Sequence, residues 1–181
     1  MLTRPYIHNL PRKNPSTARP GQAAVEMAIV APILLLLVLA TVDFARALND
    51  LQVMADLTRQ GSSMASRGTT LSTATNALVQ GSAPLNLASS GEIIITAISR
   101  VNNTDQITGQ VSQGVLTKAS KIGIGVGSIA TVPSAIDDIF KNNSNETVYA
   151  TEVYYSFAPI TPLASLWNIV IPNNFYQIAY F

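Results

Sequence analysis

The sequence predicts an α+β protein in which a long N-terminal transmembrane helix is packed on a small antiparallel β-sheet head. Two observations lead to this prediction. An apolar run occupies residues 22–42, and the segments typical of β-strands all follow residue 91. Helices first and strands afterwards favour an α+β domain over alternating α/β units. The 181 residues leave room for one ordinary domain beside the apolar segment.

The charge is distributed unevenly along the chain. Residues 1–20 contain four basic residues and no acid, a charge of +4, whereas residues 21–181 carry −3, so the total is only +1. A nearly neutral chain with 12% charged residues lacks the basic footprint of a nucleic-acid-binding protein. We therefore expect no nucleic-acid partner, and we interpret residues 1–21 as a basic cytoplasmic leader.

Residues 22–42, QAAVEMAIVAPILLLLVLATV, contain a single charge, Glu26. A helix of this length spans roughly 30 Å, which matches the hydrocarbon core of a bilayer. The basic leader precedes it, and positive charge is retained in the cytoplasm, so we predict an inner-membrane, single-pass protein with its N-terminus inside and its C-terminal head outside. Pro32 removes one backbone hydrogen bond within this run, which predicts a tolerated helix kink.

The helix is expected to continue over residues 43–68, because apolar side chains recur at spacings of three and four. Gly61-Ser62-Ser63 weakens this pattern, and Gly68 is a plausible stop. The predicted buried stripe consists of Phe44, Leu48, Leu51, Met54 or Ala55, and Thr58.

Residues 69–181 form the predicted extracytoplasmic α+β head. Residues 69–91 are rich in Thr, Ser, Ala and Gly and are interpreted as a loosely ordered connector that could include a helical turn. Residues 115–128 are ambiguous, because three glycines disfavour both helix and strand, and Ser134 is a candidate helix cap. Strands are predicted at 92–100, 107–111, 147–157 and 175–181, a short helix at 133–140, turns at 102–105 and 142–145, and an apolar helix or loop at 163–170.

The junction between leader and helix contains a glycine, Gly21, followed five residues later by Glu26 at the edge of the apolar run. This arrangement resembles the type IV prepilin processing signal. Residues 21–48 also contain the motifs Gly21-Gln22, Val25-Glu26, Pro32 and Asp43-Phe44-Ala45-Arg46. With these motifs, residues 21–48 resemble, more narrowly, the TadE-type pseudopilins of the tight-adherence (Flp) pilus system, which are pilin-like. Residues 153–155 and 161–163 are similar to the strand and Thr-Pro segment of that family, whereas Met27 stands where aromatic residues are usual.

The resemblance implies a minor pseudopilin-like structural component in the biogenesis of a Flp-type (type IVb) pilus or a related secretion system. It implies cleavage between Gly21 and Gln22 by a prepilin peptidase, and contacts with other pilins or pseudopilins and with the assembly platform. It also implies that Glu26 pairs with the N-terminal amine of a neighbouring subunit. Glycine before the scissile bond is physically suitable, because a side chain would crowd an extended backbone in a protease cleft.

Two other classes of function are weighed against this interpretation. Ala45-Arg46-Ala47 could serve an ordinary signal peptidase, whose cut would release a soluble binding or adhesion domain. An enzyme is disfavoured, because there is no cysteine and the single histidine is His8. Asp137 and Asp138 are adjacent and are interpreted as solvated surface, and the loop 123–128 lacks the Lys-Ser/Thr ending of a phosphate loop. We therefore expect no catalytic residues, metal, cofactor or small-molecule substrate.

Overall fold

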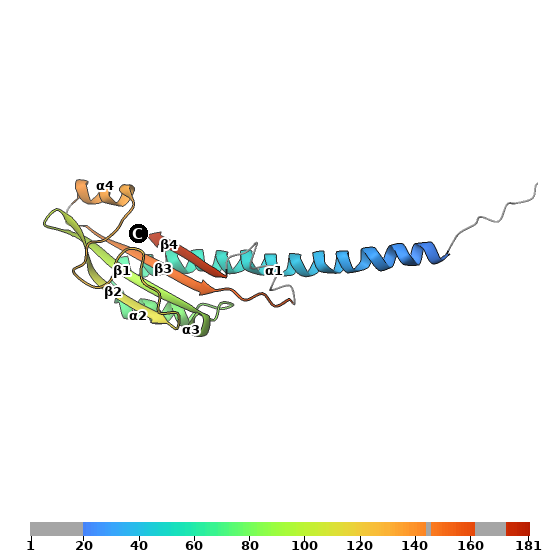
Figure 1. The fold of residues 1–181 in the computed structure, drawn as a ribbon. Coiled ribbons are helices and arrows are strands. Elements are labelled where there is room, and N and C mark those ends of the chain that lie inside the picture. Colours follow the sequence, from blue (N-terminus) through green and yellow to red (C-terminus); the bar gives the residue numbers. More distant parts are fainter. Residues whose placement is uncertain (1–19, 144–145, 162–172) are drawn as a thin grey trace, which may run out of the picture. The chain divides into compact units, whose positions relative to one another are not determined.

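The computed structural model of the chain describes residues 20–143, 146–161 and 173–181. The predicted segment 163–170 therefore lies outside the described residues. The elements follow the predicted order of a long helix first and strands afterwards, and the α+β class is confirmed (Figure 1). They are α1 (Pro20–Ser66), α2 (Leu71–Gln80), α3 (Leu87–Ser90), β1 (Gly91–Val101), β2 (Thr104–Gly114), α4 (Ser134–Asn142), β3 (Thr147–Ser156) and β4 (Asn174–Tyr180).

The chain divides into two compact units, one ending at Val38 and one running from Leu39 to Phe181. In the first unit the described part is the N-terminal portion of α1, and all of residues 21–38 are exposed. Within the described residues, one helix is long and apolar enough to cross a membrane, with a mean hydropathy of 2.6 in its most apolar window. Such an exposed apolar surface indicates a membrane-anchored, single-pass protein.

The second unit is built around one four-stranded antiparallel sheet with the strand order β2-β1-β3-β4. β1 and β2 form the predicted hairpin, whose two loop residues, Asn102 and Asn103, have φ angles of 50° and 62°. Two consecutive positive φ angles are those of a type I′ turn, which matches the twist of the flanking strands and which asparagine tolerates. The four predicted strands are confirmed, and β2 is longer at both ends than predicted.

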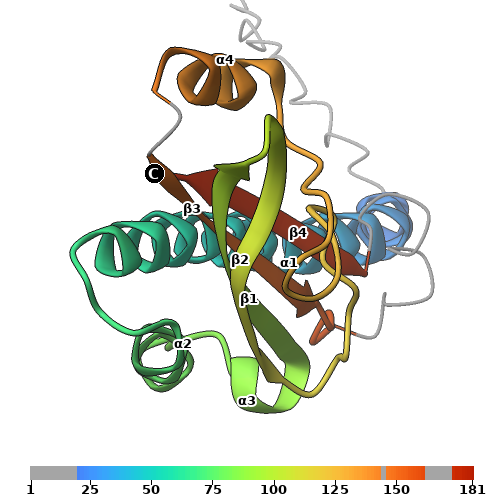
Figure 2. The same ribbon diagram turned by 90° about the vertical axis from the view of Figure 1, so that its left-hand side faces the viewer.

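Both faces of the sheet are covered (Figure 2). One face packs against the Leu39–Ser66 part of α1 and against α2, and its core includes Met54, Leu78, Ile93, Ile95, Val153 and Phe175. The other face packs against α4 and the segment 115–133, and its core includes Ile98, Ile107, Ile122, Phe140, Val148 and Ala150. This double coverage explains why eight consecutive residues of β1, Gly91–Ile98, are all buried.

The predicted buried stripe of α1 is wrong in its first half. Phe44 and Leu48 are 49% and 45% exposed, whereas Asp43 and Ala47 lie on the buried face. The physical reason is that Asp43 finds hydrogen-bond donors in the head, so its burial is compensated. The stripe is correct farther along, at Met54 and Thr58. The buried positions are Asp43, Ala47, Asp50, Met54, Leu57, Thr58, Gly61, Ser62 and Ala65.

The Gly61-Ser62-Ser63 segment does not interrupt the helix, which continues to Ser66, and its first two residues lie against β3. A Cβ atom on Gly61 would lie 2.7 Å from the Oγ1 of Thr151, which leaves no room for any other residue. Ser62 donates a hydrogen bond to the carbonyl oxygen of Ala179 at 2.9 Å and its hydroxyl lies 3.0 Å from Thr151 Oγ1. Small residues here therefore fix the helix to the sheet.

The end of α1 is the predicted one. Gly68 adopts a φ of +90°, its N–H donates to Ala65, and the N–H of Thr69 donates to Met64. This pair of hydrogen bonds is the Schellman motif, which satisfies the last helical carbonyls and favours glycine at the left-handed position.

Two local predictions in the head need correction. Residues 69–91 contain a ten-residue helix, α2, whose start is capped by the Thr70 hydroxyl accepting from Thr73 N at 3.3 Å. Ser134 is not a cap: α4 begins at Ser134 after Pro133, and no side chain caps it. The ambiguous segment 115–128 is a loop, joined to β2 by an isolated bridge between Gln106 and Ile129.

Candidate functional site on the N-terminal helix

The residues of the predicted processing signal lie in the first turns of α1 and are exposed. Gln22 donates a hydrogen bond from Nε2 to Glu26 Oε1 at 3.2 Å, so the two side chains share one face of the helix. A Cβ atom added to Gly21 would meet nothing within 4 Å. Val25 is 61% exposed. The site thus presents an exposed carboxylate in the second turn of α1, and the first turn contains no acidic residue.

Pro32 lies inside α1, in the exposed apolar part of the first unit. Its predicted kink stays a prediction. On this part of the helix Glu26 is the single ionisable side chain between residues 21 and 42. A charge surrounded by apolar helix is costly in a bilayer and requires a partner or access to water.

Asp43 connects α1 to the segment that follows β3. Its side chain is fully buried, Oδ1 accepts from the N–H of Ile160 at 3.1 Å, and Oδ2 accepts from the hydroxyl of Thr161. Hydrogen bonds to a carboxylate are about twice as strong as neutral ones. The two stretches that resemble the TadE-type pseudopilins, residues 21–48 and 153–163, are therefore in contact through Asp43 and Thr161.

Arg46 and Phe44 complete the predicted motif but lie differently. The Arg46 guanidinium carbon is 5.8 Å from the ring centroid of Phe157, a cation–π contact, and its Nη1 is 4.0 Å from Asp43 Oδ1. Phe44 points away from this core and is half-exposed. The structure therefore brings together Asp43 and Arg46, while Phe44 remains on the outer face of α1.

Two buried glutamates on the sheet were missed from the sequence. Glu152 on β3 is fully buried, and its carboxylate accepts from Lys121 N at 2.9 Å, from Tyr176 at 2.9 Å and from Tyr154 at 3.2 Å, and also from the Ser120 hydroxyl. Burial, reinforced by the negative charge of Glu152, raises the pKa of both tyrosines.

The second of these glutamates, Glu92 on β1, is 4% exposed and accepts from the N–H of Lys118. The two glutamates together hold the segment 118–121 against the sheet. The burial of Glu152 could have been predicted from the alternation of side chains along a strand, since Glu152 lies on the same face as the apolar residues Val148 and Ala150.

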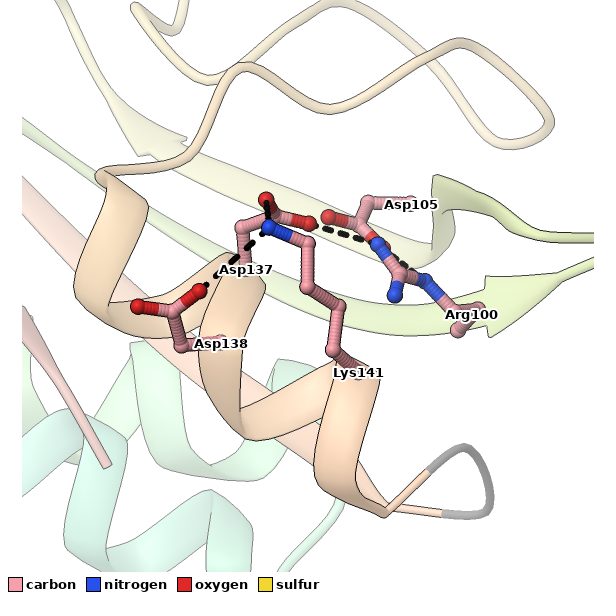
Figure 3. A network of polar contacts seen from close by, with 5 residues as sticks. All are labelled: Arg100, Asp105, Asp137, Asp138 and Lys141. Atoms are coloured by element: carbon pink, nitrogen blue, oxygen red, sulfur yellow. Dashed lines mark hydrogen bonds and ion pairs between the residues drawn. The ribbon is translucent and has the colours of Figure 1, made fainter.

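A charged network attaches α4 to the β1–β2 hairpin (Figure 3). Arg100 donates to Asp105 at 2.8 Å and to Asp137 at 2.6 Å, and Lys141 lies 2.6 Å from Asp137 and 3.3 Å from Asp138. Hydrogen bonds from Lys141 and Arg100 lower the pKa of Asp137. The sequence predicted that the adjacent Asp137 and Asp138 are solvated surface residues. This is correct for Asp138, which is 66% exposed, and wrong for Asp137, which bridges Arg100 and Lys141.

No group of three or more His, Cys, Asp or Glu side chains that could hold a metal ion is found within residues 20–143, 146–161 and 173–181. Asp43, Asp137 and Glu152 instead accept hydrogen bonds from the protein or form ion pairs.

Comparison with known proteins matches residues 21–63 to the family model described as TadE-like protein. No curated protein and no solved structure matches the chain. The matched range lies within α1 and includes every residue of the predicted processing signal and of the Asp43–Arg46 motif. Residues 21–63 of this chain are therefore similar to the TadE-like family, as the sequence motifs predicted.

Proposed function

We propose that this protein is a pseudopilin-like structural component in the biogenesis of a Flp-type pilus or a related secretion system. The observation that supports this most directly is the TadE-like match over an exposed, apolar helix. A TadE-like segment suggests involvement in Tad pilus assembly. In this proposal residues 22–42 anchor the protein in the inner membrane, with the basic leader in the cytoplasm and the head outside.

The helix has two successive roles in this proposal. It first serves as a membrane anchor, and during assembly it becomes a packing surface between subunits. Leaving the lipid is energetically feasible only if neighbouring helices rebury its apolar side chains. Glu26 then neutralises the α-amine that cleavage after Gly21 exposes on a neighbouring subunit. The partners of the protein in this proposal are a prepilin peptidase, other pilins and pseudopilins, and the assembly platform. The role of the protein is structural, without catalysis or a cofactor.

The position of residues 45–47 supports permanent attachment over release by a signal peptidase. These residues lie in the interior of α1, and Ala47 is 3% exposed in the core. A cut after Ala47 would also remove Asp43 from the head, so that Ile160 and Thr161 would lose the carboxylate that accepts their hydrogen bonds. A released soluble domain would therefore lose one of its buried contacts.

Leader removal is tested with Gly21→Leu. The intact mass of the membrane-bound protein should remain that of the full chain, because a bulky side chain blocks the protease cleft. Ala23→Leu is the matched control, because it adds the same side chain two positions farther along the same exposed helix and should leave processing unchanged. Normal leader loss in Gly21→Leu would refute cleavage at this bond, and a mature N-terminus at Leu48 would support signal-peptidase release instead.

The role of Glu26 is tested with Glu26→Ala in a complementation assay for piliation. The variant should insert into the membrane at the normal level and fail to support pilus assembly. Asp56→Ala is the control, because it removes an exposed carboxylate from the same helix, where the Asp56 side chain is 68% exposed. Normal piliation by Glu26→Ala would contradict the proposed pairing with the α-amine.

A further inference from the structure

A cleft of about 500 Å³ opens in the second unit on the membrane-proximal part of α1. One side of it is formed by a single face of the helix, and the other by the loop before α3 and by β3. Its lining residues are Val42, Ala45, Arg46, Asn49, Asp50, Pro84 and Tyr155. A cavity of this size accommodates a small organic group.

Two charged groups of opposite sign line the cleft, and each has a buried atom without a hydrogen-bond partner among the described residues. Asp50 is 6% exposed, yet its Oδ2 accepts no hydrogen bond from the described part of the chain. The Nη1 of Arg46 is likewise without a hydrogen-bond acceptor there, since Asp43 Oδ1 lies 4.0 Å away. Burial raises the pKa of Asp50, an effect that Arg46 partly offsets. A buried carboxylate left unpaired is costly, so a cationic donor in the cleft would be stabilised.

The cleft lies at the depth of the lipid headgroups if residues 22–42 span the hydrocarbon core. A rise of 1.5 Å per residue places Arg46 about 6 Å and Asp50 about 12 Å beyond Val42. Each polar headgroup layer is about 5–8 Å thick. Helix side chains tilt toward the helix N-terminus, which here is toward the membrane, so the Asp50 carboxylate faces the outer edge of this layer.

We propose that this cleft binds the headgroup of a phospholipid that carries a primary amine, of the phosphatidylethanolamine type. The phosphate lies against the Arg46 guanidinium, and the ammonium group donates to Asp50, which is farther from the bilayer centre. The two protein groups are one helical turn apart, a spacing that a two-carbon ethanolamine linker can bridge. This inference depends on membrane anchoring by residues 22–42 and not on the proposed role in pilus assembly.

The chemistry of the site distinguishes among phospholipids. Phosphatidylcholine has the same phosphate and the same net charge, but its quaternary ammonium has no N–H to donate to Asp50. Phosphatidylglycerol has the phosphate but no cation. A site that uses both charges therefore prefers the primary amine, whereas Arg46 alone would contact the phosphate of all three lipids and would not favour phosphatidylethanolamine.

The test uses the full-length chain in mild detergent mixed with equal amounts of phosphatidylethanolamine, phosphatidylcholine and phosphatidylglycerol, with native mass spectrometry of the retained lipid. We expect phosphatidylethanolamine to be retained at least about tenfold over the other two, as one charge-assisted hydrogen bond allows. Equal retention of the three lipids by the wild-type protein would overturn the proposal without any variant. Displacement by soluble phosphoethanolamine as readily as by the lipid would also overturn it, because the site would then not require a lipid.

Two variants assign the roles of the charges. Asp50→Asn, which keeps the side chain's size, should abolish the preference for phosphatidylethanolamine. Arg46→Gln should lower the retention of all three lipids. Asp56→Asn, on the exposed side of the same helix, is the control and should behave as wild type. A preference that survives in Asp50→Asn would overturn the assignment, and if this variant does not fold, the comparison of lipids on the wild-type protein decides.

Discussion

Replacing Asp43 by asparagine should loosen the head from α1 in a measurable way. The carboxylate accepts from Ile160 N and from the Thr161 hydroxyl, and asparagine can accept only with its single oxygen, while its NH₂ group would face the second donor. A hydrogen bond to a charged group contributes about 1.5–3 kcal/mol. Removing the buried charge recovers part of this, so we expect a loss of about 2 kcal/mol from the free energy of unfolding of the head, against a typical total of 5–15 kcal/mol.

The assay is equilibrium denaturation of the full-length chain in detergent, followed by the near-ultraviolet circular dichroism of the head's tyrosines. Asp43→Asn should lower the midpoint without changing the slope of the transition. Asp56→Asn is the control, because its exposed ion pair with Arg59 is long, at 3.9 Å, and should contribute little. An unfolding free energy of Asp43→Asn within 0.5 kcal/mol of wild type would refute the reasoning, because that is the size of an ordinary surface effect.

Three further predictions concern the head. Gly61→Ala should destabilise the head in the same denaturation assay by up to about 2 kcal/mol, because overpacking against β3 outweighs the helix propensity of alanine; a stabilised variant would contradict this. Hydrogen bonds from Lys141 and Arg100 lower the pKa of Asp137 below its ordinary value of 3.8. The ionised Asp137 therefore stabilises the fold at pH values above 3.8, and this stabilisation is lost as the pH falls below that value. Midpoints of wild type and Asp137→Asn should therefore differ at neutral pH and converge in acid; a constant difference would count against the ion pairs. Glu152→Gln should accelerate tryptic cleavage after Lys121, because the segment is released from the sheet; unchanged cleavage would show that other contacts hold it.

The strands were predictable from sequence because their signal is local. β1 and β3 are dense in β-branched and aromatic residues, and two asparagines suffice to form the hairpin turn. The buried face of α1 was not predictable from sequence, because hydrophobicity alone cannot show which side of this helix is buried. Asp43 is buried by donors 117 and 118 residues farther along the chain. Phe44, although apolar, remains half-exposed on the same helix.

The candidate site divides in the same way. Its motif residues could be recognised in the sequence, because Gly21, Glu26 and Asp43 stand at the spacings of the TadE-type motifs. The residues that contact them could not be predicted, since the contact between Asp43 and Thr161 exists only once the chain after β3 returns to α1. Glu152 was missed for a related reason: the hydroxyl and amide groups that justify its burial come from the segment 120–121 and from β4.

The pairing at the end of the last strand decides where a reporter can be attached. Phe181 exchanges two backbone hydrogen bonds of 2.9 Å with Tyr149, and the carbonyl of Ala179 accepts from Ser62 on α1. An epitope or fluorescent fusion joined directly to Phe181 would pull on these bonds. A flexible linker between Phe181 and the reporter would remove this strain. Imaging of this protein in living cells is therefore better served by a reporter on a flexible linker than by one joined directly to Phe181.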